Sequence, residues 1–275
     1  MKLGLSSFTF GWAVGVPGHV PADPLDEHGL LDACQELGAP LLQIGDNLPL
    51  RAFDDARLGR LADRAAREGV RIEVGGRGLT LERVAQYSTI ARRLGSNLLR
   101  MVIDEGAYQP DSRTVAGILR ESIPLLDGLV LGLENHDRFK AKVLRSIVQS
   151  AGSDRIGVCL DTANSLGAGE GIEAVASLLA PLTVNLHIKD FAIERVPHLM
   201  GFQVGGRPAG GGMLDVPGIL RQVAAAGGRC ATAVLELWTP PEASLAATLE
   251  KERDWAKRSF AYLRPLFERE FGGAA

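Results

Sequence analysis

The sequence predicts an α/β protein with a single (β/α)8 TIM barrel domain that spans residues 1–275. Eight short apolar runs alternate with eight segments of helical periodicity along the whole chain. The apolar runs are continuous, which is typical of parallel strands covered by helices. A doubly wound sheet would place a glycine-rich phosphate-binding turn after the first strand, and residues 6–12 contain no such turn.

The expected strands are the apolar runs, at residues 3–8, 41–44, 70–74, 97–103, 129–134, 155–161, 183–188 and 232–236. The expected helices are residues 25–37, 54–68, 81–94, 112–126, 138–149, 171–179, 216–225 and 244–266. Gly38, Gly69 and Gly95 follow three of these helices directly, in the position where glycine commonly ends a helix. A glycine-rich insertion separates the seventh strand from its helix and is expected to be a loop.

Composition and charge exclude several classes of protein. The chain carries 30 Lys and Arg against 33 Asp and Glu, a net charge of −3, which argues against binding nucleic acid through a basic face. Hydrophobic residues make up 46% of the chain, which excludes a disordered protein. The three cysteines are far apart and odd in number, which favours a reducing compartment. With no export signal and no apolar segment of about 18 residues, we expect a cytoplasmic protein without membrane contact.

Four polar side chains stand at the ends of consecutive predicted strands. Glu134, Asp161, His187 and Glu236 end the fifth, sixth, seventh and eighth strands, so a barrel would gather them at one rim. Three carboxylates this close repel one another unless a cation lies between them. The sequence therefore predicts one divalent metal bound by these four residues. Oxygen ligands with one nitrogen favour Mn²⁺ or Mg²⁺, and Co²⁺, Zn²⁺ and Fe²⁺ stay open.

The same strand ends carry a family resemblance. The motifs Leu-Glu-Asn at 133–135, Cys-Leu-Asp-Thr-Ala-Asn at 159–164, His-Ile-Lys-Asp at 187–190 and Glu-Leu-Trp at 236–238 resemble those of the xylose-isomerase-like TIM barrels. That superfamily includes sugar isomerases, ketose 3-epimerases, inosose dehydratases and endonuclease IV. The resemblance implies the same four metal ligands. It also implies that Glu134 and Glu236 act as catalytic acid and base.

The predicted activity is isomerisation or epimerisation of a sugar or a sugar-derived hydroxy-ketone through a metal-stabilised enediolate. A cation that binds adjacent hydroxyl and carbonyl oxygens acidifies the intervening C–H group, and a glutamate moves the proton. Loss of CO₂ or of a β-substituent in place of a proton would make a decarboxylase or lyase. Ketose 3-epimerases typically have a histidine three residues after the strand-six aspartate, and this chain has Asn164.

The insertion after the seventh strand supports the alternative activity. Its Arg195, His198 and Arg207 are candidates to bind an anionic substrate. The insertion is similar to that of the subgroup that includes 3-oxo-isoapionate decarboxylases. The alternative is therefore a metal-dependent decarboxylase or lyase of a 3-oxo sugar acid or 3-oxo-glycoside. Further candidate substrate contacts are His136, Asn164, Lys189 and Trp12, while Asp46, Glu73 and Arg77 are expected to line the barrel mouth.

Two other classes are less favoured. Endonuclease IV needs more histidine ligands and a basic rim, whereas this chain has five histidines and a negative charge. A non-catalytic sugar-binding barrel would use the same rim without turnover. The expected partner is a small carbohydrate or sugar-acid substrate, with no nucleic acid and no membrane, and a homo-oligomer stays open.

Overall fold

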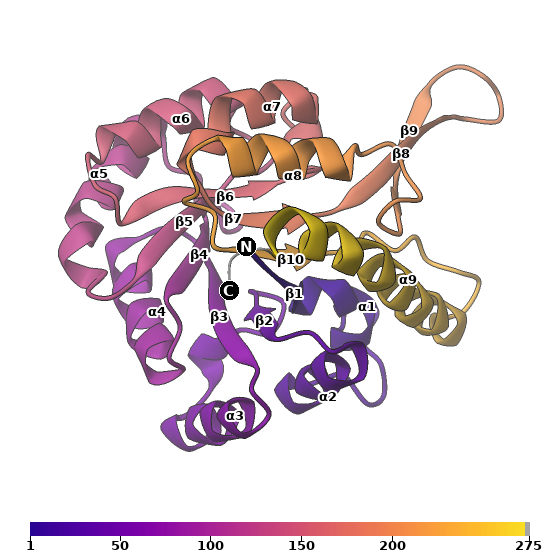
Figure 1. Ribbon diagram of the computed structural model, residues 1–275, viewed down its shortest axis with the longest axis horizontal. Helices are drawn as coiled ribbons and strands as arrows, with labels where there is room; N and C mark the ends of the chain where they lie inside the picture. Colours follow the sequence, from indigo (N-terminus) through magenta and orange to yellow (C-terminus); the bar gives the residue numbers. More distant parts are fainter. Residues whose placement is uncertain (273–275) are drawn as a thin grey trace.

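The computed structural model describes residues 1–272, so the last three residues of the predicted domain lie outside it. Eight parallel strands close into a barrel in the order β1-β10-β7-β6-β5-β4-β3-β2 (Figure 1). This confirms the predicted (β/α)8 fold. The strands are β1 (Lys2–Ser6), β2 (Leu41–Ile44), β3 (Arg71–Arg77), β4 (Leu98–Val102), β5 (Val130–Glu134), β6 (Ile156–Asp161), β7 (Thr183–Ile188) and β10 (Thr232–Leu235).

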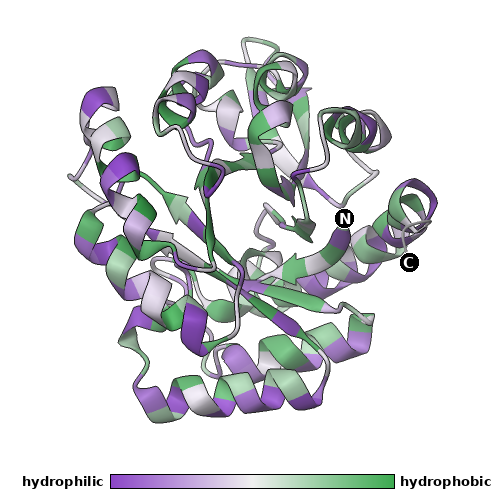
Figure 2. Ribbon diagram, turned by 60° about the vertical axis from the view of Figure 1, so that its left-hand side comes forward, coloured by the Kyte–Doolittle hydropathy of each residue, from purple (hydrophilic) through white to green (hydrophobic). Residues whose placement is uncertain are grey.

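Helices surround the barrel and turn their apolar faces toward it (Figure 2). Side-chain caps begin several of them, as where Asp54 accepts from the Arg57 amide and Thr80 from the Arg83 amide. Gly38 ends its helix in the left-handed conformation with φ of 64°. The helices are α1 (Gly11–Val14), α2 (Glu27–Leu37), α3 (Asp55–Arg67), α4 (Leu81–Arg93), α5 (Ser112–Ser122), α6 (Ala141–Ser150), α7 (Ile172–Leu179), α8 (Val216–Ala225) and α9 (Leu245–Phe271).

Several predicted boundaries differ from the structure, and two of these differences have a clear physical cause. The first strand ends at Ser6 and not at residue 8, because Ser6 and Thr9 form a reciprocal capping box that starts a short 3-10 helix. The last helix continues to Phe271, five residues past its predicted end at residue 266, with Pro265 inside it. Buried Leu263 and Phe267 lie on either side of Pro265, so packing against the barrel keeps this end helical.

The insertion after β7 was expected to be a loop, and that prediction is wrong. It forms an antiparallel hairpin of β8 (Asp190–Arg195) and β9 (Phe202–Arg207), which projects away from the barrel (Figure 1). Asp190 anchors the hairpin, because its carboxylate accepts from the backbone amides of Gly210, Gly212 and Leu214. Glycine is required in this turn, since a Cβ on Gly212 would lie 2.2 Å from the Asp190 carboxylate.

The helices show no membrane-spanning character. Within residues 1–272, no helix combines the length and the apolar content needed to cross a bilayer.

Candidate metal centre

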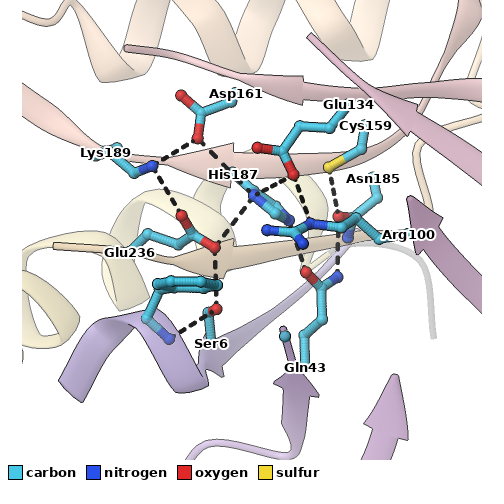
Figure 3. A network of polar contacts seen from close by, with 12 residues as sticks. Ser6, Gln43, Arg100, Glu134, Cys159, Asp161, Asn185, His187, Lys189 and Glu236 are labelled. Atoms are coloured by element: carbon cyan, nitrogen blue, oxygen red, sulfur yellow. Dashed lines mark hydrogen bonds and ion pairs between the residues drawn. The ribbon is translucent and has the colours of Figure 1, made fainter. Parts of the chain in front are cut away.

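The barrel brings the four predicted ligands together at the carboxyl ends of its strands (Figure 3). Glu134 and Asp161 are the last residues of β5 and β6, and Glu236 directly follows β10. His187 lies beside Asp161 in the register of β6 and β7. All four side chains are at most 2% exposed. Parallel strands with matching registers therefore create the cluster that the sequence predicted.

The three carboxylates surround one nitrogen of His187. Its Nδ1 lies 3.8 Å from Glu134 Oε2, 3.9 Å from Asp161 Oδ2 and 3.2 Å from Glu236 Oε1. Within residues 1–272, His187 Nδ1 is buried without a hydrogen-bond partner, and Glu134 Oε2 and Asp161 Oδ2 are buried with only ion pairs to Arg100 and Lys189. Buried polar atoms are rarely left in this state unless something else binds them. Oxygen and nitrogen atoms that converge in this way fit a divalent cation.

Cys159 also lies close to the cluster, within range of Glu134 and His187. Burial among negative groups raises the pKa of the Cys159 thiol well above its ordinary value. The thiol therefore stays protonated, and its sulfur lies 3.2 Å from Asn185 Oδ1, to which it donates. The thiol is thus already bonded to Asn185, and the oxygen and nitrogen atoms that face His187 Nδ1 make the better set.

Lys189 bridges two of the carboxylates. Its Nζ lies 2.9 Å from both Asp161 Oδ2 and Glu236 Oε2. Burial alone would lower the pKa of Lys189, but the surrounding carboxylates outweigh it and hold the pKa above its usual value. Burial would likewise raise the pKa of Glu236, but the charges of Lys189 and Arg100 hold it well below its usual range. Both side chains are therefore charged at neutral pH.

Arg100 is a second buried cation at the cluster, and sequence reasoning missed it. It comes from β4, is 2% exposed, and places Nε 2.5 Å from Glu134 Oε2. Its Nη1 lies 2.8 Å from Asp46 Oδ1. Burial would raise the pKa of Asp46, but Arg100 and Arg77 outweigh it and hold that pKa below its usual value. The available signal was an arginine in the middle of the apolar run Leu-Leu-Arg-Met-Val.

Hydrogen bonds fix the remaining carboxylate oxygens. Asn164 Nδ2 donates to Glu134 Oε1 at 2.8 Å, and the Ser6 hydroxyl donates to Glu236 Oε1 at 3.0 Å. The backbone amides of residues 163 and 164 donate to Asp161 Oδ1 at 2.8 and 2.7 Å. The second oxygens of Glu134 and Asp161, which pair with Arg100 and Lys189, are thereby held toward His187 Nδ1, which pre-organises the cluster for a cation.

Two of the predicted substrate contacts lie at this centre and five do not. Asn164 contacts Glu134, and Lys189 contacts Asp161 and Glu236. His136 is partly exposed and lies 2.6 Å from Asp137, and the Trp12 indole donates to the Thr239 carbonyl.

The three candidates on the hairpin bond within it. Arg195 donates to the Leu199 carbonyl, His198 accepts from the Met200 amide, and Arg207 pairs with Glu194. In the described part of the chain, no hydrogen bond or ion pair joins Arg195, His198 or Arg207 to the cluster. Glu73 was expected at the mouth and lies instead inside the barrel, 3% exposed.

Fold and site together define a class of protein: a closed (β/α)8 barrel whose strand ends hold a buried cluster compatible with one divalent metal. The family model for xylose isomerase-like TIM barrels matches residues 76–266. The chain belongs to this family, as its strand-end motifs predicted.

A relative in sequence agrees with this assignment, and two solved structures share the fold. The chain is 33% identical over 265 residues to a 3-oxo-isoapionate decarboxylase of Pectobacterium atrosepticum, covering 96% of this chain and 95% of that protein. It superposes on a D-psicose 3-epimerase from Clostridium cellulolyticum with a TM-score of 0.72 at 15% identity, over 96% and 98% of the two chains. A Mycobacterium smegmatis family member crystallised with magnesium gives a TM-score of 0.69 at 15% identity, over 95% and 97%.

Proposed function

We propose that this protein is a divalent-metal-dependent decarboxylase of a 3-oxo sugar acid. The observation that carries the proposal is the 33% identity, across almost the full length of both chains, to a 3-oxo-isoapionate decarboxylase. The sequence motifs favoured an isomerase or epimerase and kept this activity as the alternative. The relative and the buried cations at the site support the alternative better.

The residues that would hold the metal are Glu134, Asp161, His187 and Glu236. Mn²⁺ or Mg²⁺ bound there would supply a positive charge that polarises the ketone oxygen of the substrate. In a 3-oxo acid, the bond between the carboxylate carbon and the neighbouring carbon breaks and CO₂ leaves. The electron pair of that bond moves into the adjacent ketone group. A proton must then be added to the carbon that carried the carboxylate.

Lys189 is suited to deliver that proton. It is a buried ammonium group between Asp161 and Glu236, which keep it charged. After donation, the neutral amine recovers a proton from solvent, so the step balances. Asn164 lies 3.3 Å from Lys189 Nζ and 2.8 Å from Glu134, in position to bond a substrate hydroxyl beside the donor.

Epimerisation places a different demand on the same residues. It requires one group to remove a proton from carbon and another to return it on the opposite face. Glu236 Oε2 lies 2.9 Å from the ammonium of Lys189, so this carboxylate is already ion-paired and is poorly placed to remove a proton from carbon. Decarboxylation needs a proton donor and no such base, so the pairing of a charged Lys189 with Glu236 supports decarboxylation.

An isotope experiment separates the two reactions. The Mn²⁺-loaded protein is incubated in D₂O with 3-oxo-isoapionate and, separately, with D-psicose and L-ribulose. The proposal expects CO₂ release from the acid, with one deuterium on the carbon that lost CO₂. A Lys189→Met variant should release CO₂ more slowly, because it lacks the proposed proton donor. Lys257→Met is the matched control, since Lys257 pairs with Glu36 on the surface. Epimerised ketoses without CO₂ release from the acid would overturn the proposal.

A further inference from the structure

A chain of buried polar side chains lies beneath the metal centre, inside the barrel (Figure 3). Gln43 Oε1 lies 2.7 Å from His187 Nε2. The other end of this amide, Gln43 Nε2, lies 3.1 Å from Glu73 Oε2 and 3.1 Å from Asn185 Oδ1. Gln43 therefore connects the imidazole of His187 to a carboxylate on β3, which lies beside it in the register of β2 and β3.

The hydrogen bonds of this polar network run in one direction. A glutamine amide donates only through its nitrogen and accepts only through its oxygen. Because the Gln43 nitrogen donates to Glu73 and Asn185, its oxygen must accept from His187. The proton of the neutral imidazole is then on Nε2, and Nδ1 keeps a lone pair that faces Glu134, Asp161 and Glu236.

The direction begins at Glu73. Glu73 Oε2 accepts from the amide nitrogens of Gln43 and Asn185, which lie 3.1 and 3.4 Å away. Asn185 Nδ2 also donates to the Thr232 hydroxyl at 2.9 Å, which leaves the hydroxyl proton free to bond Glu73. Asn185 Oδ1 in turn accepts from Gln43 and from the Cys159 thiol. The side-chain amides of Gln43 and Asn185 are therefore both oriented by the carboxyl group of Glu73.

Burying this carboxylate is costly. Glu73 is 3% exposed, and burial raises the pKa of its carboxyl, although Thr232, Gln43 and Arg71 oppose the shift. Barrel interiors are usually filled by branched apolar side chains, which carry no such cost. Within residues 1–272, Glu73 forms no hydrogen bond or ion pair with the four proposed metal ligands, so direct contact with them does not explain its burial.

We propose that Glu73 is a positioning residue for the metal centre: through Gln43 it holds the proton of His187 on Nε2 and keeps Nδ1 free to bind the cation. This inference concerns the metal centre of the proposed function and does not depend on which reaction follows. Residues of this kind typically change metal affinity by about 10- to 100-fold when they are replaced.

The decisive variant is Glu73→Gln, which is nearly isosteric. The amide at position 73 can donate to Gln43 Oε1, so Gln43 can turn over and present its nitrogen to His187 Nε2. The imidazole proton would then move to Nδ1 and block the metal position. In metal-free protein labelled with ¹⁵N-histidine, and with the His187 signals identified by a His187→Gln variant, we expect the Nε2–H tautomer in the parent and the Nδ1–H tautomer in the variant. The Kd for Mn²⁺, measured by chelator competition, should rise about 10- to 100-fold.

A double variant tests whether direction, rather than packing, is responsible. In Gln43→Glu combined with Glu73→Gln, the carboxylate at position 43 again accepts from His187 Nε2, so the Nε2–H tautomer and tight Mn²⁺ binding should return. If Glu73→Gln does not fold, Gln43→Met removes the acceptor without changing charge and should give mixed tautomers with weaker Mn²⁺ binding.

An unchanged tautomer with Mn²⁺ affinity within twofold of the parent would overturn the inference. So would a double variant that binds Mn²⁺ as weakly as Glu73→Gln alone. Both readouts use protein without substrate. They therefore fail or succeed separately from the proposed decarboxylation.

Discussion

The ammonium of Lys189 lies 2.9 Å from the carboxylate of Glu236 at the centre of the strand-end cluster. Both side chains are almost fully buried. Lys189 directly follows β7, and Glu236 directly follows β10. Burying a cation–anion pair to this extent is energetically costly, because each charge loses its hydration. The net charge of the carboxylate cluster therefore depends on the ammonium group of Lys189.

Replacing Lys189 with Met should leave Mn²⁺ binding in place and remove the proposed proton donor. We expect kcat for CO₂ release to fall by about 10²- to 10⁴-fold, the usual contribution of a positioned acid. KM should change far less, which steady-state kinetics would show. Equal loss of Mn²⁺ affinity and of kcat would instead place Lys189 in metal binding.

Arg100 should contribute more to stability than any surface ion pair of this chain. Its guanidinium contacts Glu134 and Asp46 inside the barrel, so Arg100→Met leaves Glu134 without its cation, while Asp46 keeps only Arg77. Breaking a buried pair in this way costs about 3–5 kcal/mol of unfolding free energy. Urea denaturation would measure the loss. The matched control is Arg258→Met, whose exposed pair with Asp254 should contribute about 0.5 kcal/mol or less.

The hairpin should depend on one glycine at its base. A Cβ on Gly206 would lie 1.9 Å from the backbone oxygen of Trp238, so Gly206→Ala must separate β9 from the segment after β10. We expect faster cleavage of the hairpin by a protease and a lower Tm. Gly205→Ala is the control, because its added Cβ would meet only an Arg207 guanidinium nitrogen, at 3.4 Å. Equal protease resistance in both variants would contradict this account of the hairpin base.

Periodicity and strand ends were sufficient to predict the barrel and the four side chains that converge at its rim. Both depend on local patterns: an apolar run that ends in Glu134 or Asp161 places that residue at the rim of any parallel barrel. The hairpin was missed because its strands pair only with each other, and its outer residues, among them Phe202 and Val204, are exposed. Because these strands are exposed, they need no continuous apolar run, which is the pattern by which the barrel strands were predicted.

The interior network was harder to predict for a different reason. Gln43, Glu73, Arg100 and Asn185 each interrupt an apolar strand, which is a visible signal. Their partners, however, lie on strands up to 144 residues away, as in the bond between Gln43 and His187. Which polar residues share a level inside the barrel depends on strand register, and register is set by closure of the whole sheet.

Glu252 should make stability depend on pH. Its buried carboxylate accepts from the amides of Trp12 and Ala13 at 2.9 and 3.0 Å, and burial raises its pKa from an ordinary value of 4.5 to about 7. Between these two values the native chain binds a proton that the unfolded chain has lost. The contribution of Glu252 to stability therefore falls as pH rises through this window, by about 3 kcal/mol in total. In Glu252→Gln this slope should disappear. Urea denaturation of both proteins at pH 5, 6, 7 and 8 gives the difference in unfolding free energy, in which all other titrating groups cancel. A difference that does not change with pH would show that Glu252 does not titrate in this range.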